Sequence, residues 1–308
     1  MQLKDMRAGD CTSIVCYVKD VQEGRTKYNK PFLTFTLLDS EKTEIKARKW
    51  DMTKEAFTDL GAKLIFCKLS VSIYKEELSY EVGVFREATE EEGNVVDFIQ
   101  SAPMSGETMF QEIYDFAKTF HDKDYGTLVC NIYMDHKKDL LVWGAAKAVH
   151  HNMIGGLLYH TYRMLQSATA IAKIYQFRKE VLYTGVILHD IGKLVELSTN
   201  EEGVSEYTVA GSLLTHSLLG CDLVKEYGEK LDLPKEKIMV LRHLIAAHHG
   251  RLEWGAIEKP KITEAFLLHQ LDVIDAGMFQ LESLATSPGA FSDKIFGLDN
   301  QKFYEPRF

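Results

Sequence analysis

The sequence predicts a two-domain chain of the mixed α and β class, with a small β-barrel at the N-terminus followed by an all-α domain. Residues 1–90 alternate apolar and polar side chains in short runs between turn residues, which is the period of half-buried strands. From about residue 106 the apolar residues recur every three or four positions, which is the period of helices packed on a core. The 308 residues are enough to form two such cores.

The N-terminal region is expected to hold five strands and one short helix. The strands are expected at residues 11–18, 32–38, 44–50, 63–74 and 78–85, and the helix at 53–60. In the second strand Leu33, Phe35 and Leu37 share one face, which is expected to be buried. Three strands, a helix and two strands is the order of an OB-fold, a Greek-key barrel that often binds single-stranded nucleic acid.

One face of the third strand carries cations and a tryptophan. Lys46, Arg48 and Trp50 alternate along it, and Phe32 is a neighbour on the preceding strand. Rings that stack bases, beside cations that hold phosphates, are what a sequence-tolerant single-strand groove requires. Alternating charge is also common on solvated sheet faces. The residues alone therefore leave a nucleic-acid-binding face and a solvated face as alternatives.

The rest of the chain is expected to form a linker, a helical domain and a tail. An acidic stretch opens the linker at 91–105, the helical domain spans 106–286, and residues 287–308 lack clear periodicity. Helices are expected at residues 109–120, 139–151, 157–174, 179–188, 213–227, 235–247 and 263–284.

Charge, cysteine content and the lack of long apolar runs indicate which partners and which cell compartment to expect. The net charge of −9 shows no global basic field, which counts against a polyanion partner, although a local groove can be basic on an acidic protein. The five cysteines are odd in number and form no CxxC pair, so reduced thiols are expected. The charged N-terminus has no apolar signal region, and no apolar run is long enough to span a membrane. A cytoplasmic protein is therefore expected.

The strongest chemical signal is a His-Asp pair, His189 and Asp190, at the end of an apolar run that closes with Leu188. A buried carboxylate needs a counter-charge, and a metal ion would supply it. Lys193 lies on the same helix face as His189 if the helix continues. One interpretation is a functional residue beside the His-Asp pair, and the alternative is a solvated lysine at a helix C-terminus.

Further histidines and aspartates recur at intervals of about one helix plus a loop, so separate helices can direct ligands to a common centre. The candidate metal ligands are His160, His189, Asp190, His216, His248, His249 and Asp272. Imidazoles and carboxylates without a thiolate suit Mn, Fe, Co, Ni or Zn better than Ca or Mg. A lone histidine in an apolar stretch is usually structural, and His243 and His269 are expected to be so. A His-Asp pair and a His-His pair in one domain are not explained by packing.

The ordered pattern H…HD…H…HH…D over residues 160–272 resembles the HD-domain metal-dependent phosphohydrolase superfamily, and His-Asp-x-Gly-Lys at 189–193 is its most specific element. Combined with the OB-fold order, nearly the full length resembles the YhaM family of bacterial 3′-to-5′ exoribonucleases. Further local matches are residues 30–32, 155–161, 248–250 and 271–276.

The resemblance implies two divalent metal ions, Mn²⁺ first, with Co²⁺, Fe²⁺, Ni²⁺ or Zn²⁺ as alternatives. It implies that one ion binds His160, His189, Asp190 and Asp272, and that the other binds Asp190, His216, His248 and His249. Asp275 competes with Asp272 for its role, and Asp272 is preferred because it matches the aspartate of the superfamily's final motif. Asp190 and Lys193 are the expected catalytic residues, and Lys193 is expected to contact an oxygen of the scissile phosphate. His150 and His151 are weaker candidates, which either line the substrate path or begin a helix.

The activity that the resemblance implies is hydrolysis of single-stranded RNA, and also of single-stranded DNA, to nucleoside 5′-monophosphates by a metal-activated hydroxide. Phe32, Lys46, Arg48 and Trp50 would hold the strand, and a homo-oligomer would help to enclose it. One alternative is an HD phosphohydrolase of free nucleotides whose barrel serves assembly. Another is a non-catalytic single-strand or DNA-binding factor with a structural metal site.

Overall fold

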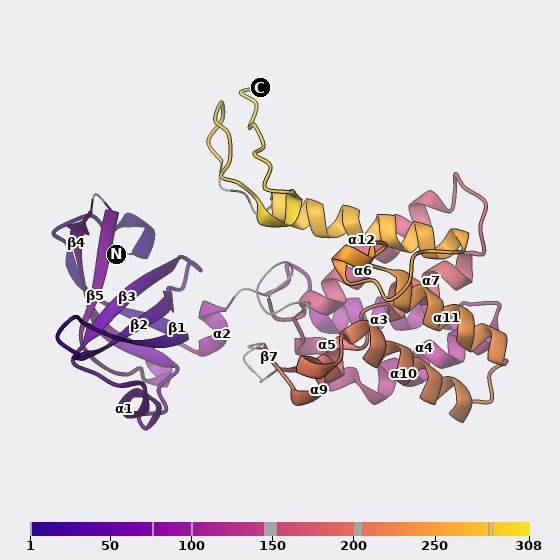
Figure 1. Cartoon of the computed structure of the whole chain (residues 1–308), viewed down its shortest axis with the longest axis horizontal. Helices are drawn as coiled ribbons and strands as arrows, with labels where there is room; N and C mark the ends of the chain where they lie inside the picture. The colour runs from indigo at the N-terminus through magenta and orange to yellow at the C-terminus, as the bar shows by residue number, and fades with distance from the viewer. Residues whose placement is uncertain are drawn as a thin grey trace. The chain divides into compact units, whose positions relative to one another are not determined.

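The computed structural model describes residues 2–75, 77–99, 101–144, 153–199, 205–282, 284 and 286–308. The chain divides into two compact units, Met1–Gln100 and Ser101–Phe308 (Figure 1). A barrel forms the first unit and helices form most of the second, so the fold class expected from the sequence is confirmed. Among the described residues, none of the helices combines the length and the apolar character needed to cross a membrane.

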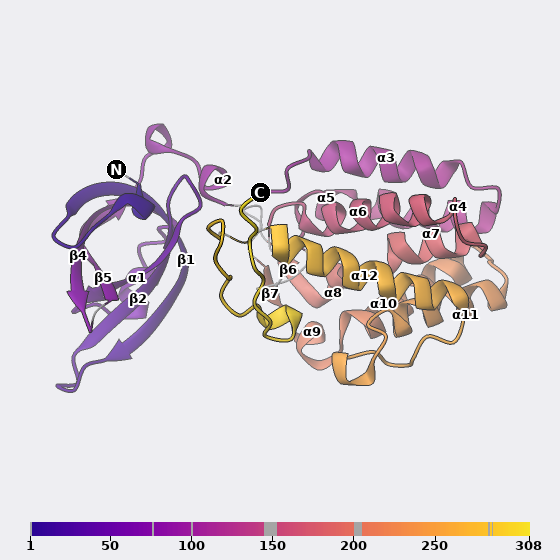
Figure 2. The ribbon, with the colours of Figure 1, turned by 90° about the horizontal axis from the view of Figure 1, so that it is seen from above.

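The first unit is a closed five-stranded barrel, seen as a ring of strands in Figure 2. It consists of β1 (Cys11–Arg25), β2 (Pro31–Leu38), β3 (Glu44–Trp50), α1 (Lys54–Thr58), β4 (Leu64–Tyr74) and β5 (Glu77–Glu87), after a short turn η1 (Leu3–Asp5). The strand order is β1-β2-β3-β5-β4, closed by the pairing of β4 with β1. The β3–β5 pairing is parallel and the others are antiparallel, which is the OB-fold arrangement.

The barrel core is the face that the alternation of β2 predicts. Leu33, Phe35 and Leu37 are fully buried. Phe57 of α1 packs on Phe35 with ring centroids 4.9 Å apart, and the side chain of Thr53 caps α1. Strand β1 is longer than the sequence predicts, because its polar second half stays paired with β2.

The expected linker is partly structured. A 3-10 turn η2 (Glu90–Glu92) and helix α2 (Val95–Phe98) lie in the first unit. The second unit contains α3 (Gly106–Lys118), α4 (Lys123–Asp135), α5 (Lys137–Val142), α6 (Gly156–Ile171), α7 (Lys179–Leu188), α8 (Lys193–Glu196), β6 (Leu197–Thr199), β7 (Ser205–Tyr207), α9 (Val209–Leu213), α10 (His216–Lys230), α11 (Lys235–Ala247), η3 (Leu252–Trp254), α12 (Thr263–Glu282) and η4 (Phe296–Leu298).

Several elements of the second unit differ from the prediction. Helix α4 was not expected, because Gly126 and several β-branched residues weaken its helical signal, although Asp122 caps it. Helix α5 ends at Val142, and much of its expected continuation lies outside the described residues. The helix expected at 213–227 is α10, which begins at His216 and ends at Lys230, and the short helix α9 before it was not expected. The β6–β7 hairpin was not expected in an all-α domain.

Helix α7 is the centre of the second unit. Every residue from Val181 to Leu188 is buried, and α4, α6, α11 and α12 pack around it (Figures 1 and 2). A helix that is apolar on all sides must lie inside a bundle. The residues that directly follow α7 therefore emerge in the protein interior.

Candidate metal centre

Two helices of the second unit end at a histidine. His189 is the C-cap residue of α7, and His248 is the C-cap residue of α11. The last carbonyls of a helix lack partners within the helix. Each ring supplies one, because Nδ1 of His189 lies 2.9 Å from the Val186 oxygen and Nδ1 of His248 lies 2.6 Å from the Ile245 oxygen. A carbonyl only accepts hydrogen bonds, so Nδ1 carries the proton and Nε2 keeps its lone pair.

Two further histidines are held at Nδ1 by carboxylates. Nδ1 of His160, in α6, lies 2.7 Å from Asp275 Oδ2, and Nδ1 of His216, in α10, lies 3.2 Å from Glu196 Oε1. Burial would raise the pKa of Glu196, but the hydrogen bond from His216 lowers it. A carboxylate at this position fixes the tautomer of a metal-binding histidine and makes the ring more basic.

The Nε2 atoms of these four rings converge on Asp190. The Nε2 atoms of His160 and His189 are 3.2 Å apart, and those of His216 and His248 are 3.4 Å apart. Asp190 lies between the two pairs, with Oδ2 3.4 Å from His189 Nε2 and Oδ1 3.4 Å from His216 Nε2. Two lone pairs that face each other repel unless a proton or a metal ion lies between them.

Asp190 is buried and charged. Burial would raise its pKa, but Lys193 and His189 hold the pKa of this carboxyl well below its usual range. Oδ2 accepts a hydrogen bond from Lys193 Nζ at 2.6 Å, whereas Oδ1 is buried and has no hydrogen-bond partner. A buried charged oxygen without a donor is costly. Its position therefore fits that of a metal ligand.

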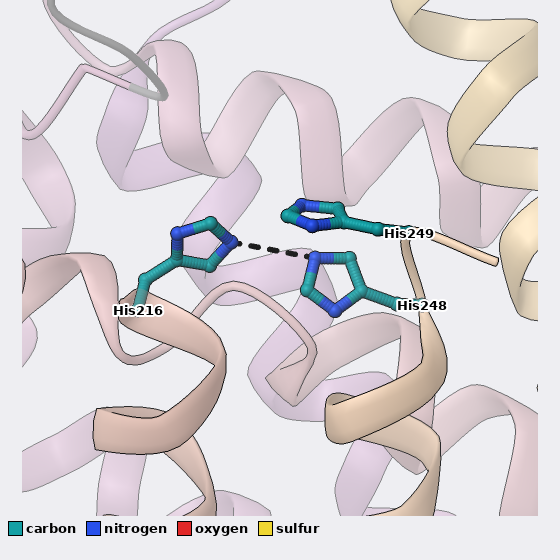
Figure 3. A group of neighbouring side chains, drawn as sticks. All are labelled: His216, His248 and His249. Carbon is teal, nitrogen blue, oxygen red and sulfur yellow. Dashed lines mark hydrogen bonds between the residues drawn. The ribbon is translucent and has the colours of Figure 1, made fainter. Parts of the chain in front are cut away.

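His249 joins the cluster beside His216 and His248. Its ring lies 4.0 Å from that of His248 and 5.1 Å from that of His216, centroid to centroid (Figure 3). Its Nδ1 is buried without a hydrogen-bond partner. Burial and the neighbouring His216 lower the pKa of His249, so the ring is neutral and has a lone pair available for a cation.

Asp272 and Asp275 of α12 lie on opposite sides of His160. Asp272 Oδ1 is 3.3 Å from Nε2, the ring atom that faces Asp190, whereas Asp275 binds Nδ1. Arg163 Nε in turn pairs with Asp275 Oδ1 at 2.7 Å. Asp272 therefore faces the cluster, and Asp275 holds His160 from behind.

Two carboxylates stabilise the protonated form of His160. Burial would lower the pKa of His160, but Asp272 and Asp275 raise it to about 9. The pKa of Asp272 in turn lies far below its usual value because His160 donates to it, against the effect of burial. The negative charge of these carboxylates can be balanced by a proton on His160 or by a divalent ion, and binding of the ion displaces the proton.

The donor set fits divalent ions of the first transition series. Two groups of ligand atoms each lie within 4.8 Å of one another, namely His160 with His189 and Asp190, and His216 with His248 and His249. Imidazoles and carboxylates without a thiolate match Mn, Fe, Co, Ni or Zn. The unpartnered Asp190 Oδ1 and His249 Nδ1 agree with this fit.

Two glycines permit the close approaches around the centre. A Cβ atom at Gly192 would lie 1.9 Å from the His216 carbonyl oxygen. Gly250 has a left-handed φ of 72°, and a Cβ atom there would lie 2.3 Å from Nε2 of His269. The turns after the His-Asp and His-His pairs therefore both require glycine.

The backbone at Lys193 differs from the expected continuous helix. The helix does not continue through it, because α7 ends at Leu188 and the Lys193 N–H closes a turn on the Asp190 carbonyl at 2.9 Å. The side chain is buried, which excludes a solvated lysine. Trp143 Nε1 donates to the Lys193 carbonyl at 3.1 Å and fixes the backbone.

Two further histidines, His243 and His269, bind backbone groups. His243 Nε2 accepts the Lys261 N–H at 3.0 Å, and His269 Nδ1 donates to the His248 carbonyl at 2.9 Å. His150 and His151 lie outside the described residues.

The barrel gathers the four candidate strand-binding residues on one outer face. β2 pairs with β3 so that Phe32 faces Trp50, and Lys46 and Arg48 follow on the same side of β3. The rings of Phe32 and Trp50 are 5.3 Å apart, and the Arg48 guanidinium is 5.8 Å from the Trp50 ring. Lys46, Arg48 and Trp50 are exposed. Both aromatic and cationic groups are thus available to solvent.

Known proteins are similar to this chain over its whole length. The HD domain model matches residues 157–277, which include the cluster around Asp190. The chain is 31% identical over 312 aligned residues to a protein of Listeria welshimeri named 3′-5′ exoribonuclease YhaM, covering 100% of this chain and 99% of that protein. The protein of the same name from Listeria monocytogenes is 30% identical with the same coverage.

The chain belongs to the YhaM family. It is a metal-dependent hydrolase of the HD type that acts on phosphodiester bonds. The YhaM relatives align with the barrel as well as with the helical unit, because the match covers the full chain. The resemblance to the YhaM family, which rests on the histidine and aspartate pattern over residues 160–272 and on the OB-fold strand order, is confirmed.

Glu196 is a positioning residue that sequence reasoning missed. We expect Glu196→Gln to weaken Mn²⁺ binding about 10- to 100-fold, because the neutral amide no longer makes the His216 ring more basic. Isothermal titration of the purified variant measures the affinity. Glu226→Gln, at an exposed position on α10, is the matched control. Equal affinities in both variants would contradict the role of Glu196.

Proposed function

We propose that this chain is a 3′-to-5′ exoribonuclease that hydrolyses single-stranded RNA, and also single-stranded DNA, to nucleoside 5′-monophosphates. The observation that carries the proposal is the position of Asp190 between two groups of histidines, with each carboxylate oxygen 3.4 Å from the Nε2 atom of a different group. Two-ion hydrolysis of a phosphodiester uses a shared ligand of this kind. The curated relatives, both named 3′-5′ exoribonucleases, support the substrate class and the polarity.

The proposed ligands form two sets that share Asp190. The first set is His160, His189, Asp190 and Asp272, and the second is Asp190, His216, His248 and His249. When bound, two divalent ions would supply a Lewis acid for the phosphate oxygens and acidify the attacking water. We propose Mn²⁺ first, and Co²⁺, Fe²⁺, Ni²⁺ and Zn²⁺ share the ligand preference.

Lys193 is the second proposed catalytic residue, beside Asp190. Its ammonium group holds Asp190 Oδ2 at 2.6 Å and leaves Oδ1 free to bind a cation. An ammonium group has three donors. A donor that does not bind Asp190 is proposed to contact an oxygen of the scissile phosphate, where negative charge increases during hydrolysis.

The two domains are proposed to have separate functions, strand binding and cleavage. Residues 1–90 would hold the strand through Phe32, Lys46, Arg48 and Trp50, and residues 106–286 would cleave it. Residues 91–105 would link the two parts, and no role is proposed for 287–308. Assembly into a homo-oligomer stays a prediction. Sedimentation velocity of the purified protein would measure its oligomeric state.

Digestion of end-labelled RNA tests the polarity. With Mn²⁺, single-stranded RNA labelled at the 3′ end should release a labelled nucleoside 5′-monophosphate at once, whereas 5′-labelled RNA should give a ladder of shortening chains. Circular RNA is the control because it has no end, and it should stay intact. Early release of the 5′ label, or cleavage of the circle, would contradict the proposal.

The same assay separates the two alternative functions. Hydrolysis of free nucleotides with no degradation of RNA would identify a nucleotide phosphohydrolase. Binding of the labelled strand without degradation under any of the five metals would identify a non-catalytic binding factor. A DNA strand of the same base sequence measures the preference between RNA and DNA.

The barrel face makes a separate prediction. Trp50→Ala should weaken binding of single-stranded RNA by about 1–3 kcal/mol, because one stacked base is lost, without a change in the melting temperature. Fluorescence anisotropy with labelled RNA measures the affinity. Val84→Ala, which removes an exposed apolar side chain of β5, is the control. A Trp50→Ala variant with wild-type affinity would favour a solvated face.

A further inference from the structure

The loop after the His-His pair is fixed against the metal centre. The Arg251 N–H donates to the His249 carbonyl at 2.8 Å, and the Ile257 N–H returns to the Ala246 carbonyl of α11 at 2.9 Å. Gly255 has a left-handed φ of 95°, and a Cβ atom there would lie 3.4 Å from Nδ1 of His249. The backbone of the loop is therefore held beside His249.

Two exposed side chains of this loop stack on each other. The Arg251 guanidinium lies 4.4 Å from the centre of the Trp254 ring, and Trp254 is 46% exposed. Trp254 also lies 6.0 Å from the ring of His269, which is buried and donates to the His248 carbonyl. Trp254 is thus supported by a residue that contacts the metal-site backbone.

Arg251 has no carboxylate partner among the described residues. Arg86, Arg163 and Arg178, by contrast, are neutralised by Glu92, Glu282 and Glu264. An arginine without an acidic partner, directly beside a cluster of metal-type ligands, has its full charge available for an anion.

The same Arg-Trp arrangement occurs in the barrel. Arg48 lies 5.8 Å from the Trp50 ring on the face proposed to hold the strand. The third tryptophan, Trp143, is buried and bound to a backbone carbonyl. Each tryptophan of the chain that is more than a third exposed therefore carries an arginine on its ring.

A stacked guanidinium is well suited to bind phosphate. Its N–H donors lie in the plane of the group, so stacking on a ring leaves them free. A phosphate accepts two of them in a bidentate contact. A lysine can also lie over a ring, but its ammonium has no plane to stack and makes no bidentate contact with a phosphate.

We propose that Arg251, positioned by Trp254, binds a backbone phosphate of the RNA strand next to the scissile phosphate. The inference rests on the proposed function and adds a substrate contact to it. The scissile phosphate must reach Asp190, which is buried, whereas Arg251 is exposed two residues beyond His249. Arg251 therefore contacts the strand just outside the bond that is cleaved.

The test compares two substrates that differ in the number of phosphates. A short oligoadenylate offers neighbouring phosphates, whereas bis(p-nitrophenyl) phosphate is a phosphodiester with only one. With Mn²⁺, Arg251→Ala should raise KM for the oligoadenylate at least about tenfold and leave hydrolysis of the small diester unchanged. Lys259→Ala, which removes an exposed cation of the same loop, is the control for net charge and should change neither rate.

Two further measurements separate the proposed contact from a structural role. Loss of one phosphate contact should reduce the slope of log affinity against log salt by about 0.7 for a single strand. Trp254→Ala should reproduce part of the defect and Trp254→Phe should restore it, because phenylalanine keeps a ring under the guanidinium. Arg251→Lys should behave like Arg251→Ala in KM, although it keeps the charge.

The outcomes are distinguishable. If Arg251→Ala matches Lys259→Ala in KM and in salt slope, the inference is wrong. It is also wrong if Arg251→Ala or Trp254→Ala changes the sedimentation coefficient, because the pair would then belong to an interface between copies of the chain. If the wild-type protein hydrolyses the small diester but not the oligoadenylate, the proposed function fails, and the inference fails with it.

Discussion

Asp190→Asn should lower the rate of RNA hydrolysis at least about a thousandfold. Asp190 contacts both groups of histidines, so the amide would weaken both proposed metal sites at once. A shared carboxylate that places two ions accounts for several kcal/mol of transition-state stabilisation, and each 1.36 kcal/mol is a factor of ten. Initial rates on 3′-labelled RNA, together with the metal content of the purified variant, measure the effect.

The control for Asp190→Asn is Asp222→Asn, at an exposed position on α10, which should keep the wild-type rate. Strand binding by the barrel should survive in Asp190→Asn, since Trp50 and Arg48 are unchanged. Circular dichroism checks the fold, because removing the partner of the buried Lys193 costs roughly 3–5 kcal/mol. A folded variant whose rate is within tenfold of wild type would refute the proposed role of Asp190.

Gly192→Ala should both destabilise the protein and displace His216. A Cβ atom at this position meets the His216 carbonyl oxygen at 1.9 Å and the Gly220 nitrogen at 2.5 Å, and backbone atoms cannot move aside as a flexible side chain can. Overpacking of this kind costs about 3 kcal/mol. That corresponds to roughly 6–12 °C in melting temperature for a domain of this size. A shift of His216 by about 1 Å should lower the rate about a hundredfold.

Gly277→Ala is the matched control for Gly192→Ala. Gly277 lies inside α12, and a Cβ atom there meets only the end of the Leu298 side chain, at 3.4 Å. Alanine favours a helix over glycine by about 1 kcal/mol, so this variant should be as stable as wild type or more so. Thermal unfolding and initial rates measure both variants. Equal melting temperatures and rates would show that the α8–α10 contact adapts without loss.

Much of the barrel could be predicted from local pattern. The alternation of Leu33, Phe35 and Leu37 follows from the two-residue period of a strand, and all three are buried as expected. β3 was predicted with its observed bounds, and with it the exposed face of Lys46, Arg48 and Trp50. The extension of β1 was not predicted, because polar residues on both faces hide the period of a strand that pairs at a hairpin.

The helical unit was predictable where helices are strongly periodic or apolar. α7 and α11 have their expected bounds, because a buried run and a Pro-led amphipathic run both begin and end clearly. α4 was missed because Gly126 has low helix propensity, and only packing shows why it is there. A Cβ atom at Gly126 would lie 2.9 Å from the Ala117 carbonyl of α3, so the two helices approach closely at that point.

The sequence by itself determined which side chains are available for the metal centre. Residue type and spacing set apart His160, the His189-Asp190 pair, His216 and the His248-His249 pair, and the chain brings all of them together. Two of the ring orientations are also local, since His189 and His248 bind the carbonyls three residues before them at helix ends.

Only the tertiary structure decided how the other two rings are held, and it gave the physical reason why Asp272, which the resemblance favours, faces the centre. His216 is fixed by Glu196 and His160 by Asp275, which are 20 and 115 residues away in sequence. Asp272 and Asp275 are one helical turn apart and equal in chemistry, so spacing cannot separate them. The crossing of α12 over α6 does, because it sets one carboxylate against Nε2 of His160 and the other against Nδ1.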